Sequence, residues 1–140
     1  MSDRFPIEVA AGLVFHGGRL LLTQRREGDH LGGLWEFPGG KREPGESMVE
    51  CLRRELVEEL GIEVEVVDCV EQVCHEYPEK VVSLAFFRCR LKAGVARPLG
   101  CAALAWVELE ELNRYVFPAA DARLLDRLLV SPEWWGRTPG

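Results

Sequence analysis

The segment from Gly40 to Ile62 carries acidic and basic residues at spacings that could build a metal site. Gly40 is followed after five residues by Glu46, and seven residues later comes the run Arg54-Glu55-Leu56-Val57-Glu58-Glu59-Leu60-Gly61-Ile62. On a helix the three glutamates of this run stand at i, i+3 and i+4, so they point to one side. Carboxylates crowded in this way repel one another unless a cation neutralises them. Hard oxygen ligands select Mg²⁺, with Mn²⁺ as the alternative, and both ions bridge to substrate phosphates.

The residues around the glutamates predict how they are positioned. Apolar side chains recur at helical spacing and predict a helix over 46–60, with its buried face formed by Val49, Leu52, Leu56 and Leu60. Arg54 is available to pair with one carboxylate and orient it. A solvated acidic helix face is the alternative interpretation. It does not account for the preceding loop 37–41, whose two glycines allow close approach of the backbone to a metal or phosphate and are followed by a lysine.

Taken together, these residues meet every position of G-x5-E-x7-R-E-U-x-E-E-x-G-U, where U is aliphatic. The segment resembles the signature of the Nudix hydrolases. The resemblance implies an α/β fold in which a mixed sheet lies between helices in an α/β/α sandwich. It also implies metal ligands at the Gly39 carbonyl, Glu55, Glu58 and Glu59, and catalytic roles for Glu55, Glu58 and Arg54. Which of Glu55 and Glu58 is the general base stays open.

The flanking residues are similar to the MutT branch of this family. They comprise Thr23-Gln24-Arg25-Arg26, the segment 34–41, His75-Glu76-Tyr77-Pro78-Glu79 and Phe117-Pro118-Ala119-Ala120-Asp121. This resemblance implies a nucleotide pocket made by Arg25, Phe37, Lys41, Tyr77 and Asp121. Each has a simpler interpretation: a solvated charge at a strand end for Arg25, a solvated lysine for Lys41, half-buried strand aromatics for Phe37 and Tyr77, and a helix cap for Asp121.

Two positions depart from the MutT pattern. Asp121 stands where MutT has Asn, and an ionised Asp only accepts hydrogen bonds, which suits an exocyclic amine of cytosine or adenine. A protonated Asp121 could imitate Asn if burial raised its pKa. Ala105, before Trp106, stands where MutT has a further Glu, and the preceding segment 98–100 offers no carboxylate. A general base must then come from the glutamates of the helix or from elsewhere.

The implied activity is Mg²⁺-dependent hydrolysis of oxidised or modified nucleoside triphosphates, such as 8-oxo-dGTP, to the monophosphate and pyrophosphate. A CTP or modified-cytosine pyrophosphohydrolase is a second possibility. A hydrolase of ADP-ribose or dinucleoside polyphosphates and a non-catalytic nucleotide-binding domain are two others. The 140-residue length leaves little room for the extra segments that ADP-ribose and dinucleoside polyphosphate hydrolases often carry.

Composition predicts one soluble domain over 1–130 followed by a tail over 131–140 that is packed back or partly ordered. Strands are expected at 7–15, 20–25, 34–37, 62–73, 81–91 and 103–107, with a second helix at 120–130. The net charge of −6 is concentrated in 46–80, where eleven acidic residues face three basic ones. This balance argues against binding a nucleic acid polymer. Five cysteines without a C-x-x-C pair, no signal peptide and no apolar span predict a cytoplasmic protein. A monomer or weak homodimer is expected.

Overall fold

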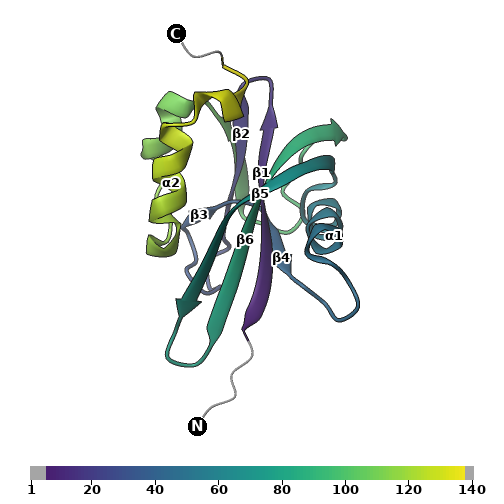
Figure 1. The fold of residues 1–140 in the computed structure, drawn as a ribbon, viewed down its shortest axis with the longest axis vertical. Coiled ribbons are helices and arrows are strands. Elements are labelled where there is room, and N and C mark those ends of the chain that lie inside the picture. Colours follow the sequence, from purple (N-terminus) through teal and green to yellow (C-terminus); the bar gives the residue numbers. More distant parts are fainter. Residues whose placement is uncertain (1–5, 138–140) are drawn as a thin grey trace.

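The computed structural model describes residues 6–137. In this part of the chain a mixed sheet of seven strands lies between α1 on one face and α2 on the other (Figure 1). The strands are β1 (Ile7–His16), β2 (Arg19–Gln24), β3 (Trp35–Glu36), β4 (Gly39–Lys41), β5 (Glu63–Glu76), β6 (Val81–Ala93) and β7 (Ala103–Val107). The α-helices are α1 (Met48–Leu60) and α2 (Ala122–Leu129). The predicted α/β/α sandwich is confirmed.

The sheet opens along one edge of β1, and this opening positions the site. β1 pairs in parallel with β6 along most of its length, from Ile7 opposite Val82 to Phe15 opposite Arg90. On its other edge β1 pairs with β2 only next to their connecting turn. β2 then diverges and pairs with β7 and β3. β4 takes the vacated edge of β1, with Ala11 opposite Gly39. The glycine-containing loop before α1 is therefore part of the sheet.

Side chains that alternate along the central strands build two cores. Ala10 and Val14 of β1 face α1 and pack with Leu52, Leu56 and Leu60. The alternate residues, Ala11, Leu13 and Phe15, face α2 and pack in a second cluster that also contains Leu124, Leu128 and Trp135. Because successive side chains of a strand point to opposite faces, one strand serves both cores. Because β1 is buried on both faces, it is fixed in position, and β4, which pairs with it, is fixed with it.

The ends of α1 follow from local sequence. Ser47 caps the helix by accepting a hydrogen bond from the Glu50 amide, while the Glu50 side chain accepts from the Ser47 amide at 2.9 Å. Such a reciprocal capping box satisfies two donors that would otherwise lack partners. At the other end, the amide of Gly61 donates to the Val57 carbonyl. The helix therefore starts and stops so that the acidic segment lies beside β4.

Several boundaries differ from the sequence prediction. The strand β4 was not predicted, because three residues containing two glycines have no strand propensity of their own. The second helix is shorter than 120–130, and a 3₁₀ helix, Ala119–Asp121, precedes it. Another 3₁₀ helix, Leu109–Arg114, was also not predicted.

The C-terminal segment packs back within the described residues. A short 3₁₀ helix, Pro132–Trp135, places Trp135 in the second core, where its indole Nε1 donates to the Leu128 carbonyl at 3.1 Å. Positions 1–5 and 138–140 of the predicted domain and tail lie outside the described residues. All five cysteines are within the described part and are free thiols. No described helix combines the length and apolar character needed to cross a lipid bilayer.

Candidate active site

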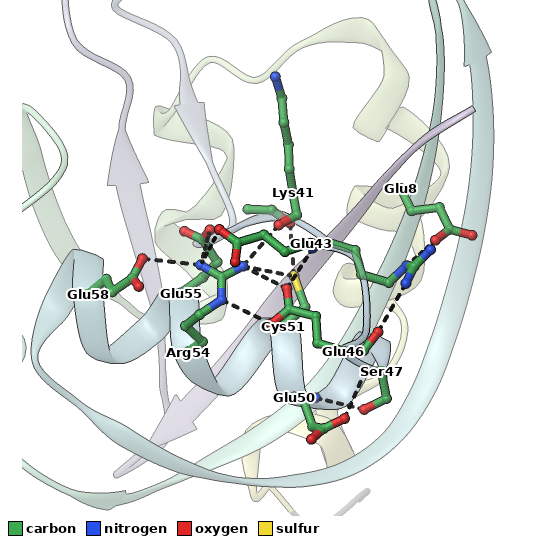
Figure 2. A network of polar contacts seen from close by, with 12 residues as sticks. Glu8, Lys41, Glu43, Glu46, Ser47, Glu50, Cys51, Arg54, Glu55 and Glu58 are labelled. Atoms are coloured by element: carbon green, nitrogen blue, oxygen red, sulfur yellow. Dashed lines mark hydrogen bonds and ion pairs between the residues drawn. The ribbon is translucent and has the colours of Figure 1, made fainter. Parts of the chain in front are cut away.

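Arg54 connects the helix carboxylates to the loop that precedes them (Figure 2). Its guanidinium donates to Glu46 at 2.7 and 3.0 Å, to Glu55 at 3.0 Å and to Glu58 at 3.2 Å. It also donates to the carbonyl of Lys41 in β4 at 3.1 Å. The Arg54 bonds, together with a bond from the Glu43 amide, lower the pKa of Glu46 to about 2. The planar guanidinium, with its five donors, thus holds helix and loop in one arrangement.

Two glycines let the backbone lie directly on the acidic side chains. A Cβ atom added to Gly40 would be 2.2 Å from the carboxyl carbon of Glu55. One added to Gly100, in the segment before β7, would be 1.8 Å from an oxygen of Glu59. Both added atoms would fall on the flexible ends of the glutamates, so a side chain at either glycine would push the carboxylate out of its present position. Glu55 is therefore covered from β4 and Glu59 from the segment 97–102.

Their surroundings make it less favourable for Glu55 and Glu59 to be ionised. Burial raises the pKa of Glu55, an effect that Arg54 opposes and that the charges of Glu58 and Glu59 strengthen. Burial also raises the pKa of Glu59, against a lowering by Arg26, with the charge of Glu58 adding to the rise. A cation placed among them would relieve both the burial and the repulsion. The donor set, carboxylate oxygens beside a glycine carbonyl, fits a hard divalent cation.

The predicted metal ligands lie in one region, but their side-chain oxygens do not converge on a common position. Among the described residues no group of three His, Cys, Asp or Glu side chains is close enough to hold a metal ion as it stands. The reason is visible in the contacts: Arg54 binds Glu55 and Glu58, while Glu59 lies against Gly100. Binding a metal there requires side-chain rotations of the glutamates.

The five residues predicted to surround a nucleotide line one cleft of about 380 Å³: Arg25, Phe37, Lys41, Tyr77 and Asp121. The cleft volume is in the range of small-ligand sites. Its floor is apolar and comes from β1 and β6, with Val9, Leu84 and Phe86 among the lining residues. Gly39 and Gly40 form part of the wall, so the cleft reaches β4.

Asp121 lies at the buried end of this cleft beside a second acid. Its residue is 7% exposed, and its carboxyl makes no capping hydrogen bond to any described residue, although it stands at the start of α2. The helix-cap interpretation of its side chain is therefore wrong. Burial, together with the charge of Glu36, raises the pKa of Asp121 to about 6. Burial raises the pKa of Glu36 as well, although Arg25 donates to it at 2.9 Å and opposes the rise.

The remaining predicted residues form the sides and mouth of the cleft. Phe37 is buried, not half-buried, and stacks on Phe117 with ring centres 5.2 Å apart. Tyr77 is half-buried and meets the ring of His30 edge-on at 5.2 Å, which joins the β5–β6 turn to the loop after β2. Lys41 is exposed, and its side chain extends away from the Arg54 network (Figure 2).

A second cavity of about 190 Å³ adjoins the cleft and shares Arg25, Glu36 and Gly39 with it. Its other lining residues include Arg26, Glu59, Gly100 and Cys101. The segment 97–102 forms one wall and is held on α1 by the amides of Leu99 and Gly100, which donate to the Glu59 carbonyl at 3.0 and 3.1 Å. The two cavities therefore lie side by side, with Asp121 lining the first and Glu59 of α1 lining the second.

The domain model that matches residues 10–127 is described as the NUDIX domain. The chain belongs to the Nudix family. Its catalytic class follows from the family: it is a Nudix hydrolase, and Nudix hydrolases generally need a divalent metal. The match spans α1, all of α2 except its last two residues, and every strand except the first three residues of β1.

Relatives and solved structures are similar over nearly the whole Nudix chain. An 8-oxo-dGTP diphosphatase of Haemophilus influenzae is 38% identical over 130 residues, which are 91% of this chain and 94% of the relative. A CTP pyrophosphohydrolase of Escherichia coli is 37% identical over 124 residues, 89% of this chain and 92% of the relative. The solution structure of the E. coli ORF135 protein matches with a TM-score of 0.79 at 34% identity and covers 94% of each chain. The MutT protein of Methanosarcina mazei also gives 0.79, at 30% identity, covering 91% of this chain and 96% of that one.

The sequence analysis assigned no site role to Glu36, His30 and Lys80, which line the cleft. Glu36 left the clearest signal, because it is an acid inside the short apolar run before the glycines. Its pairing with Arg25 could not be foreseen, since the two residues are brought together only by the antiparallel contact of β2 and β3. Arg26 belongs to a segment that is similar to the MutT branch. Its neighbours along the chain do not indicate that it lines the second cavity.

Proposed function

We propose that this Nudix hydrolase converts nucleoside triphosphates that carry an oxidised or modified base to the monophosphate and pyrophosphate, with Mg²⁺ as the metal. The observation that carries the proposal is a nucleoside-sized cleft that adjoins a second cavity lined by Glu59 of α1. Relatives named 8-oxo-dGTP diphosphatase and CTP pyrophosphohydrolase support it over most of the chain.

In this proposal the cleft holds the nucleoside. The base would lie on the apolar floor between Phe37 and Tyr77, with its polar edge toward Asp121 and Glu36. Arg25, which is held by Glu36 and by the His30 carbonyl, would flank the nucleoside, and Lys41 would approach the phosphate chain. Apolar walls with a few convergent polar groups are what a base needs for orientation and selectivity.

The reaction would take place at the carboxylates of α1. We assign the Gly39 carbonyl, Glu55, Glu58 and Glu59 as ligands for Mg²⁺, or Mn²⁺ in its place. Bound divalent cations supply charge neutralisation for phosphates and acidify water. Arg54 would keep Glu55 and Glu58 oriented, and one of the two would accept the proton of the attacking water. The water oxygen bonds to the β-phosphorus, and the bridge to the α-phosphorus breaks with its oxygen leaving on the monophosphate. One proton is released.

Asp121 and Glu36 favour a cytosine nucleotide as the second candidate substrate. Ionised, the pair only accepts hydrogen bonds, which suits the exocyclic amine of cytosine. With one proton on Asp121, it presents one donor and one acceptor, as an Asn does, and would suit 8-oxoguanine. The pKa of about 6 leaves Asp121 mostly ionised at neutral pH, so both substrates belong in the test.

The test is pyrophosphate release with Mg²⁺ from dGTP, 8-oxo-dGTP, dCTP, CTP, 5-methyl-dCTP and 2-oxo-dATP, with AMP release from ADP-ribose in parallel. Wild type and Asp121→Asn are compared. A cytosine preference that Asp121→Asn weakens supports the second candidate. A preference for 8-oxo-dGTP that the substitution leaves unchanged or strengthens supports the first. Absence of pyrophosphate from every triphosphate contradicts the proposal, and AMP from ADP-ribose would replace it.

Three further expectations belong to this proposal. The five free thiols support a cytoplasmic location, where thiols stay reduced. The net charge of −6 supports a free nucleotide, not a nucleic acid polymer, as the partner. A monomer or weak homodimer remains the expected state, and size-exclusion chromatography with light scattering tests it.

A further inference from the structure

We propose that Arg26 binds the terminal phosphate of the substrate in the second cavity and makes the enzyme prefer triphosphates to diphosphates. This inference rests on the proposed function, because it assigns a residue to the far end of the same substrate. The two cavities differ in volume and in lining. The cleft, at about 380 Å³, is twice the size of the second cavity, at about 190 Å³, and only the cleft has the apolar floor that a base requires. The phosphate chain therefore extends into the second cavity.

The charges of the second cavity single out Arg26. Its described lining residues include three acids, Asp29, Glu36 and Glu59, and two arginines. A phosphate group binds favourably beside these acids only where a cation can donate hydrogen bonds to it. Arg25 is already engaged, because its Nη1 donates to Glu36 at 2.9 Å and its Nε to the carbonyl of His30.

Arg26 makes fewer direct hydrogen bonds, although its charge also acts on Glu59 and lowers the pKa of that carboxyl against the rise caused by burial. Of its five N–H groups, described residues accept only from Nη2, which donates to the Leu99 carbonyl at 3.2 Å. This one bond holds the guanidinium at the wall made by segment 97–102, beside Gly100 and Glu59. The other N–H groups are left for a ligand, and a guanidinium matches a phosphate with two parallel hydrogen bonds.

The segment that carries Leu99 places no acidic side chain of its own beside Arg26. Gly100 packs directly on the Glu59 carboxylate, and segment 98–100 brings no acid of its own into the cavity. A further acidic side chain there would add to the charge of Glu59 and repel a phosphate. With Gly100, this part of the cavity wall is backbone, and Arg26 donates to it at the Leu99 carbonyl. The terminal phosphate would thus meet Arg26 on one side and the metal-binding end of α1 on the other.

The test compares wild type, Arg26→Gln and Arg26→Lys on the best triphosphate of the panel and on the matching diphosphate. We expect Arg26→Gln to lower kcat/KM for the triphosphate by about 10- to 100-fold, the usual effect of losing a charge-assisted pair. For the diphosphate we expect less than about threefold change. Arg26→Lys should recover part of the loss, because charge is kept and the two-bond geometry is not. Arg114→Gln, an exposed arginine outside both cavities, is the control for loss of one charge.

A second readout separates phosphate binding from a structural role. Inorganic pyrophosphate, titrated calorimetrically with Mg²⁺, should bind about tenfold more weakly to Arg26→Gln, while the nucleoside monophosphate binds as to wild type. Equal losses on triphosphate and diphosphate, or unchanged pyrophosphate binding, would overturn the inference and leave Arg26 as a support for segment 97–102. If wild type hydrolyses no triphosphate, the proposed function fails, and the pyrophosphate titration then decides the inference by itself.

Discussion

Replacing Asp121 by Asn should stabilise the protein at neutral pH. The carboxyl is almost fully buried, and its pKa is about 6, compared with the ordinary value of 3.8. The folded state therefore holds a proton that the unfolded chain releases, and stability falls as the pH rises from about 4 to about 6. Asn has the same shape and does not titrate, so the variant avoids this fall.

The size of the effect follows from the pKa difference. A shift of about 2 pKa units corresponds to about 3 kcal/mol of unfolding free energy above pH 7. The amide of Asn also loses water on burial, which offsets part of the gain. We therefore expect Asp121→Asn to be more stable than wild type by about 1–3 kcal/mol at pH 7.5, and by close to zero at pH 4.

Urea denaturation followed by circular dichroism at both pH values measures this difference. Asp68→Asn is the matched control, because Arg88 donates to Asp68 at 2.8 and 2.9 Å and lowers its pKa. Removing that charge should destabilise the protein at pH 7.5, the opposite sign. A variant of Asp121 that is destabilised at pH 7.5, or equally changed at both pH values, would refute the argument that burial of an ionised carboxyl dominates at this position.

Three other predictions concern Gly40, Trp135 and the divalent metal. Gly40→Ala should lower kcat by about 100-fold or more, because its Cβ would displace the Glu55 carboxylate; unchanged steady-state kinetics in a folded variant would contradict this. Trp135→Ala should cost about 3–5 kcal/mol in urea denaturation, since the indole is buried and bonded to Leu128; a loss below about 1 kcal/mol would show that the C-terminal segment contributes little. Removing divalent metal with EDTA should abolish hydrolysis and Mg²⁺ should restore it, and activity that persists in EDTA would argue against a metal-dependent reaction.

Local patterns were sufficient to predict the acidic helix α1. Its apolar spacing predicts a helix over 46–60, and in the structure α1 runs over Met48–Leu60, two residues shorter at its start, where Ser47 forms the cap. The placement of Arg25, Phe37 and Tyr77 around one cleft was also predicted, although from a resemblance and not from spacing. Their roles remain predictions until the substitutions are measured.

The second acid of the cleft could not be predicted in this way. Glu36 matters because it lies near Asp121, and 85 positions separate the two along the chain. Their proximity depends on β3 pairing with β2 and on α2 packing over the sheet. Neither contact is encoded by a local pattern. The raised pKa of Asp121 therefore appears only once the fold is assembled.

By itself the sequence determined the family, the acidic helix and the residue types available for metal and nucleotide binding. Those properties depend on side-chain chemistry and on spacing within single elements. Only the tertiary structure decided that β4 fills the edge left by β2, that Gly100 covers Glu59, and that Arg26 faces the second cavity. Such contacts join segments dozens of residues apart, and their energies depend on burial and distance, which exist only after the chain has folded.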